Sequence, residues 1–178
     1  MVELSMAELR EITAYAVACA EPALAIFERD CPDDPRPRAV LDEARRFAAG
    51  GNRTKVLRVT ALAAHRSART AGEMECEAAV DAARAAGHAG GAAYLHPLAK
   101  AHQVKHILGS AAHAARAIEL DVGDDRSVGA DYLARARGLA GPVVVSVLAR
   151  YPTAPGGGRV AELMRSLDAS LRHMATDR

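Results

Sequence analysis

The sequence predicts an all-α protein, and three observations support that fold class. Alanine is abundant throughout, and it is the best helix former. Aromatic residues are scarce, with no Trp, two Phe and four Tyr, whereas strands favour aromatic and β-branched residues. Apolar residues also recur every three or four positions, as on one face of a helix. We therefore expect one all-helical domain over residues 1–178, built as a multi-helix bundle.

The first helix is predicted from a capping motif. Ser5 and Glu8 form the capping box, in which each side chain satisfies the other residue's backbone N–H. The helix should extend to about Arg29. Pro22 lies inside it and removes one backbone hydrogen bond, so we expect a kink or a split near Cys19.

Prolines and glycines set the limits of the next two helices. The connector 33–38 contains two prolines and should be extended, with Pro37 as the first residue of the second helix. Gly50–Gly51 should end that helix. The third helix is expected over residues 54–70, stopped by Gly72.

Further helices are expected along the middle of the chain. Three glutamates suit the positive end of a helix dipole at the start of residues 73–86, which Gly87 follows. A short helix is expected at 89–95, ending before Pro97, and another at 110–120.

The C-terminal third should also be helical. A helix at 128–139 precedes a valine-rich run at 143–148, whose composition also suits a strand. A lone strand without a partner is not stable, so we expect a buried helix there. A loop at 152–158 then leads to a closing amphipathic helix at 159–174.

Short alanine–arginine motifs recur along the chain and leave a second arrangement open. Their spacing of roughly twenty to thirty residues is also typical of stacked helix pairs in a solenoid. The motifs lie at residues 43–46, 63–66, 82–85 and 112–116.

Charge and hydropathy exclude several classes of partner. The net charge is +1 with acids and bases interleaved, so no overall field attracts nucleic acid. No stretch approaches the roughly twenty apolar residues of a membrane span, and the acidic N-terminus lacks the pattern of a signal peptide. Three cysteines without a CxxC pattern indicate reduced thiols. We expect a cytoplasmic protein with neither nucleic-acid nor membrane partners.

The third helix carries a basic stripe on a different face from its apolar stripe. Such a stripe is usually a solvated surface, and the other interpretation is a site for an acidic partner. Its members are Lys55, Arg58, His65, Arg66 and Arg69.

The segment 96–109 holds three of the seven histidines. In a continuous helix, His102 and His106 would share one face and could chelate zinc, with His96 as a third ligand. However, Gln103 stands where zinc hydrolases carry Glu, and Lys105 places a positive charge beside any cation. We therefore predict no metal and no cofactor, and expect the imidazoles to hydrogen-bond backbone groups.

A second polar segment is the connector with Asp34, Arg36 and Arg38. These residues can form local salt bridges or an anion-binding edge. If the fold brings both segments together, they would form one polar patch for an acidic or phosphate-bearing partner. The candidate partner-binding residues are Asp34, Arg36, Arg38, His96, His102, Lys105 and His106. No phosphate-binding loop or nucleophile motif is present, so no catalytic residue is assigned.

Several blocks of this sequence resemble one family. The chain is similar to the small helical "putative immunity protein" family, related to immunity protein 5 of bacterial polymorphic toxin systems. The similarity extends from the first helix to residues 150–152. One mild departure is Phe47, at a position after the paired basic residues where the family has a larger aromatic such as Trp. The blocks that carry it are residues 33–38, 43–50, 63–65 with Arg69, 83–87, 96–98 and 102–109, of which the last is the most specific.

The resemblance implies a bacterial, cytoplasmic, non-catalytic protein that binds and neutralises a cognate toxin. A homo-oligomer is compatible with it. The alternative is a small helical enzyme, or a ligand-binding or metal-binding protein, that uses the segment from His96 to His106.

Overall fold

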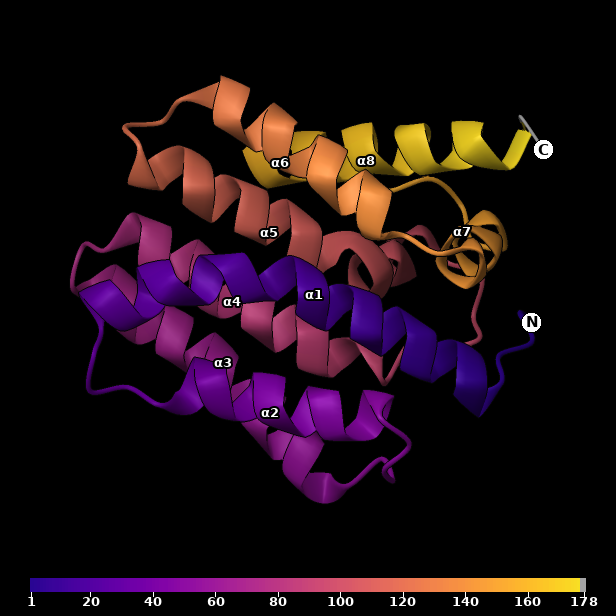
Figure 1. The fold of residues 1–178 in the computed structure, drawn as a ribbon, viewed down its shortest axis with the longest axis horizontal. Coiled ribbons are helices and arrows are strands. Elements are labelled where there is room, and N and C mark those ends of the chain that lie inside the picture. The colour runs from indigo at the N-terminus through magenta and orange to yellow at the C-terminus, as the bar shows by residue number, and fades with distance from the viewer. Residues whose placement is uncertain (177–178) are drawn as a thin grey trace.

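Helices make up most of residues 1–176, the part of the chain that the computed structural model describes (Figure 1). The structure is 76% helical and these residues contain no strand, which confirms the predicted all-α class. The elements are α1 (Met6–Asp30), α2 (Arg36–Ala48), α3 (Lys55–Glu73), α4 (Glu77–Ala92), the 3₁₀ turn η1 (Ala101–Val104), α5 (Lys105–Asp121), α6 (Arg126–Leu139), α7 (Pro142–Ala149) and α8 (Arg159–Thr176).

The helices pack as a bundle around α4. This helix contacts α1, α2, α3 and α5, while α5 in turn packs against α6 and α8. One contiguous hydrophobic cluster includes residues from every α-helix. In a solenoid each repeat contacts only its neighbours, whereas here α1 packs on α4 and α5, far along the chain. The structure is therefore a bundle, and the recurring alanine–arginine motifs do not mark stacked repeats.

Small residues allow α4 to occupy the centre. Most of its buried residues are alanine and glycine, which let neighbouring helix backbones approach closely. A Cβ added at Gly90 would lie 2.4 Å from Cγ2 of Val40 on α2 and 3.0 Å from Cβ of Ala61 on α3. Larger side chains at this position would push the helices apart.

The start of the first helix is as predicted. The Glu8 N–H donates to Ser5 Oγ at 3.1 Å, and the Ser5 N–H donates to the Glu8 carboxylate at 2.8 Å, which completes the capping box. Helix α1 then continues through Pro22 as one element and is not split near Cys19. Buried side chains on both sides of the proline, such as Leu24, hold the two halves in one helix.

Two helix boundaries in the middle of the chain differ from prediction. Helix α3 continues through Gly72, and the chain turns at Glu75, whose φ is 59°. Helix α4 begins at Glu77 and runs through Gly87 to Ala92, so the separate short helix expected at 89–95 belongs largely to α4. A Cβ added at Gly87 would lie 2.8 Å from the His65 ring, so this helical glycine makes room for a residue of α3. A Cβ added at Gly72 would lie 3.6 Å from Val80 Cγ2, an ordinary contact, so no neighbouring residue requires a glycine there.

The remaining elements follow the prediction more closely. Helix α5 starts at Lys105, five residues before the expected start, because η1 leads directly into it. Helix α6 starts at Arg126, where the Asp125 side chain accepts from the backbone N–H of Ser127. The valine-rich run is helical in α7, and α8 begins at Arg159 as expected.

The bundle has two distinct ends. In Figure 1 the N-terminus and the α4–α5 connection lie at the right, whereas the α1–α2 connector and the α3–α4 turn lie at the left. Within the described residues no single helix is long and apolar enough to cross a membrane; α6 and α7 reach that length and composition only together, with a bend of 102° between them.

Candidate partner-binding surface

The two polar segments predicted from the sequence lie at opposite ends of the bundle. Asp34 and Arg36 lie beside the end of α3, where Arg36 contacts Thr70. The segment 96–106 follows the far end of α4. That helix has 16 residues, and a rise of 1.5 Å per residue separates its ends by about 24 Å. The single combined patch is therefore not formed.

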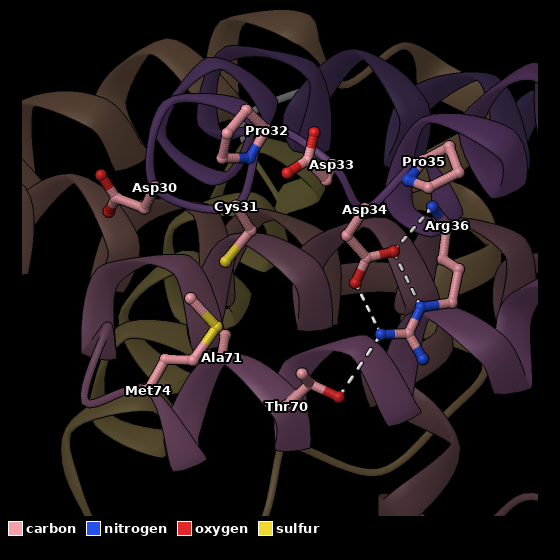
Figure 2. Close-up of a pocket in the computed structure, with 10 residues that line it drawn as sticks. All are labelled: Asp30, Cys31, Pro32, Asp33, Asp34, Pro35, Arg36, Thr70, Ala71 and Met74. Carbon is pink, nitrogen blue, oxygen red and sulfur yellow. Dashed lines mark hydrogen bonds and ion pairs between the residues drawn. The ribbon is translucent and has the colours of Figure 1, made fainter.

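At the first end, Asp34 is the centre of a local network (Figure 2). Its carboxylate accepts from Arg36 Nε at 2.8 Å, from Arg36 Nη2 at 2.6 Å and from the buried Ser67 hydroxyl at 2.6 Å. The Arg36 guanidinium and the Ser67 hydroxyl lower the pKa of Asp34 to about 2. This network ties the connector to α3. Arg38 instead pairs with Glu28 at the exposed surface, at 2.5 and 2.7 Å.

A cavity of about 520 Å³ lies beside this network. Figure 2 shows the sulfur atoms of Cys31 and Met74 on one side and the Arg36 guanidinium on the other, near Thr70. The only cation in the lining is Arg36, which is already paired with Asp34. The cation in the cavity lining is therefore already engaged in a salt bridge.

At the other end, the histidines of segment 96–106 have local partners. His96 Nδ1 accepts from the Leu98 N–H at 3.2 Å, and His106 Nδ1 lies 3.0 Å from the carbonyl of Gly91. His102 Nε2 lies 2.9 Å from the side-chain amide of Gln103. Two of the three imidazoles thus hydrogen-bond backbone groups, as the non-metal interpretation predicted.

The metal arrangement considered above needed a continuous helix through this segment. His102 lies in η1 and His106 in the first turn of α5, so one α-helix does not carry both. Among residues 1–176, no group of three or more His, Cys, Asp or Glu side chains is arranged to hold a metal ion. Burial lowers the pKa of His106.

Three other histidines form a stack across α3, α4 and α5. The rings of His88 and His113 are stacked, with centroids 5.0 Å apart and planes inclined by 12°. His65 meets His88 edge to face, with centroids 5.3 Å apart. We call these three residues the histidine stack. It joins one residue from each of three helices.

Glycines make room for the stack. A Cβ added at Gly87 would lie 2.8 Å from the His65 ring, and one added at Gly109 would lie 2.9 Å from the His88 ring. His106 similarly lies 3.4 Å from the Cβ position of Gly91. His65 and His88 thus each lie over a glycine of the next helix along the chain, and His106 lies over a glycine of the preceding one.

The histidine stack has a paired end and an unpaired end. His113 Nδ1 lies 2.6 Å from Asp81 Oδ1, and both side chains are largely buried. His65 and His88 make no hydrogen bond within residues 1–176. Burial lowers the pKa of His65, and lowers that of His88 further, because the ring is desolvated and lies near other basic groups. Both rings are therefore neutral at pH 7.

Unpaired cations surround the histidine stack. Arg58 and Arg69 lie seven residues before and four after His65, on the same face of α3. Arg84 of α4 and Lys105 of α5 are close enough to contribute to the lowered pKa of His65. Within residues 1–176 none of these four cations forms an ion pair, and the Arg58 guanidinium lies over the Tyr94 ring, 4.8 Å from its centroid. We call Arg58, Arg69, Arg84 and Lys105, together with the stack, the basic face.

The arginines of α1 and α2 behave differently. Those with ion pairs are Arg29, Arg36, Arg38, Arg45 and Arg46. Toward the α3–α4 turn, the basic face ends at Glu75 and Glu77, which line a cavity of about 470 Å³ with Arg84. Exposed arginines without an ion pair also occur on α6, at Arg135 and Arg137, so the basic face differs from that surface by its histidine stack.

Sequence reasoning singled out four of the seven residues of this face. The stripe with Arg58, His65 and Arg69 was visible as a helical period, and Lys105 was singled out within its histidine segment. His88 and His113 were not identified, because their proximity to His65 depends on how three helices pack. Gly87 makes room for His65 and Gly109 for His88, and these partners are far apart in the sequence, so no local pattern signals the stack.

The fold and this face define a small all-α protein with a cationic, histidine-rich surface on three adjacent helices. A family model described as "Imm-5 like putative immunity protein" matches residues 3–140, which include α1 to α6. The chain therefore belongs to this Imm-5-like family, as its sequence motifs predicted. No curated protein and no solved structure matches the chain.

Proposed function

We propose that this protein is an immunity protein that binds a cognate toxin protein in the bacterial cytoplasm and neutralises it without catalysis. Membership of the Imm-5-like family supports the proposal. The observation that carries it is the basic face, where four cations have no ion pair and two imidazoles have no hydrogen bond inside the described chain.

The cations of the basic face are exposed and have no ion pair inside the described chain, whereas ion pairs engage arginines of α1, α2 and α5. A partner that covers the basic face would supply the missing acceptors. Cations without ion pairs favour binding, because cations already paired within the protein would first have to break those ion pairs.

The histidine stack is also rigid, which favours tight binding. Its rings lie in close contact with the backbones of α4 and α5, at Gly87 and Gly109. Side chains already fixed in place lose little conformational entropy when a partner binds. Inhibition by binding alone requires such affinity, since the inhibitor must occupy the toxin continuously.

The predicted partner-binding residues take different positions in this proposal. Lys105 belongs to the basic face, and His106 lies beneath it against Gly91. Asp34, Arg36 and Arg38 lie at the α1–α2 end, and a contact there would be separate from the basic face.

Co-expression with the products of neighbouring genes tests the proposal. One product should arrest growth of a bacterial host when expressed alone, and this chain should restore growth and co-purify with that product. If every neighbouring product is harmless, or if a toxic one is neither bound nor neutralised, the proposed function is wrong.

A further inference from the structure

We infer that the basic face is the docking surface for an acidic protein partner, whose carboxylates are received between Arg84 and Lys105 over the edge formed by His65 and His88. This inference rests on the proposed function and adds to it the site and the chemistry of the partner.

The charges on this face are complementary to an acidic surface. Arg58, Arg69, Arg84 and Lys105 come from three helices and are exposed. The carboxylate closest to the stack is that of Asp81, which is 2.6 Å from His113 and buried. Asp81 is engaged by His113, and none of the four cations forms an ion pair within residues 1–176, while Arg58 lies over the Tyr94 ring. Carboxylates are suitable ligands for guanidinium and ammonium groups.

The imidazoles add directional donors between these charges. A neutral imidazole has one N–H donor, and His65 and His88 use neither ring nitrogen within residues 1–176. A partner carboxylate can therefore accept from the stack as well as from Arg84. The groups that face His88 are His65 from α3 and His106, His113 and Lys105 from α5.

An apolar residue within the face favours a protein over a nucleic acid. Leu62 lies four residues after Arg58 and is 55% exposed, on the same side of α3 as His65. Protein interfaces combine such apolar contacts with a charged periphery. Nucleic-acid binding depends instead on dense positive charge, and the net charge here is only +1.

The arrangement also predicts that docking is linked to protonation. A carboxylate placed beside His65 and His88 favours their charged forms and so raises their pKa values from the lowered range of the free protein. Binding should therefore take up protons and should strengthen as the pH falls from 8 to 6.

A charge-reversal pair with a matched control tests the inference. The test variant is Arg69→Glu/Arg84→Glu. The control is Arg135→Glu/Arg137→Glu, which makes the same charge change at two exposed arginines of α6 that also lack ion pairs within residues 1–176. Circular dichroism and thermal melting should first show that both variants fold.

Growth rescue and two soluble probes then serve as readouts. Against the toxic neighbouring product, the test variant should lose rescue and bind at least about tenfold more weakly, whereas the control should resemble wild type. With poly-L-glutamate as probe, the ring-proton NMR signals of His65 and His88 should shift in wild type and in the control, and not in the test variant. A DNA duplex of the same length serves as the second probe.

The outcomes separate the two proposals. If wild type rescues growth and the test variant rescues equally well, the docking surface is wrong while the proposed function holds. If wild type does not rescue growth, the proposed function fails, and the NMR titration still tests the face by itself. Tighter binding of the DNA duplex than of poly-L-glutamate would overturn the acidic-protein assignment.

Discussion

Gly109 of α5 lies directly beneath the imidazole of His88 of α4: a Cβ added at Gly109 would be 2.9 Å from Cγ and Nδ1 of that ring. Gly87 of α4 has the same relation to His65 of α3. The histidine stack thus depends on two positions where a helix has no side chain. Each glycine and the histidine that packs over it therefore form one packing contact.

Replacement of Gly109 should therefore displace the stack. We expect Gly109→Ala to destabilise the protein by roughly 1–3 kcal/mol, because the added methyl group forces His88 out of its place in a packed site. Gly138→Ala is the control: Gly138 is also helical, and nothing lies within 4 Å of its Cβ position. That change should be neutral or stabilising, because alanine is the better helix former. Urea denaturation of both variants checks the prediction, and equal midpoints would contradict it.

The sequence predicted the helices well because their signals are local. Ser5 with Glu8, and Asp125 before α6, act within one turn of the chain. Gly87 shows where local reasoning fails. It reads as a helix stop, yet the helix continues through it, since its missing side chain makes room for a ring from another helix.

The candidate site was harder to predict because it depends on contacts between helices and not on local signals. The Asp34–Arg36 pair was expected as a local contact because the residues are two positions apart. The stack joins residues 65, 88 and 113, and their contact depends on the register of three helices. The periodicity of apolar residues along each helix does not show how three helices align. The sequence therefore pointed to the histidines of segment 96–106, which are close together along the chain.

The lowered histidine pKa values predict a pH-dependent stability. His65, His88 and His106 titrate below the usual value of 6.5 in the folded protein and near 6.5 when unfolded. As the pH falls through 6.5, the unfolded chain binds protons that the folded chain does not, so folding becomes less favourable. The urea midpoint should be highest above about pH 7 and lower at pH 5.5.

A variant identifies the source of that pH dependence. His88→Gln removes the ring with the most strongly lowered pKa, so the fall in midpoint between pH 7.5 and 5.5 should become smaller. The carboxylates of Glu8 and Asp34, with pKa values near 2, change stability only at lower pH. Identical midpoints for wild type at pH 7.5 and 5.5 would refute this explanation.

Glu119 should be essential for the packing of the C-terminal helices. Its side chain is fully buried and accepts from Arg116 of α5 at 2.9 Å and from Arg159 at the start of α8 at 3.1 Å. Glu119→Gln removes the negative charge that both arginines share, and we expect the free energy of unfolding to fall by about 3 kcal/mol.

Glu162→Gln is the control, because Glu162 pairs with the same Arg159 while its own side chain is 48% exposed. Chemical denaturation at pH 7 should show a large loss for the first variant and less than about 1 kcal/mol for the second.

Arg36 and Arg38, in the first turn of α2, allow a role in stability to be distinguished from a role in partner binding. Arg36 is held by Asp34, whose carboxylate also accepts from the buried Ser67, so Asp34→Asn should cost about 1–3 kcal/mol. Arg38 pairs with Glu28 at the exposed surface, and Glu28→Gln should leave the melting temperature nearly unchanged.

A variant that changes both Arg36 and Arg38 would not distinguish lost stability from lost binding. Arg38→Ala alone avoids this problem: if it weakens toxin binding at an unchanged melting temperature, the connector is a second contact. Unchanged binding, with Asp34→Asn melting lower, would assign the connector to holding α1, α2 and α3 together.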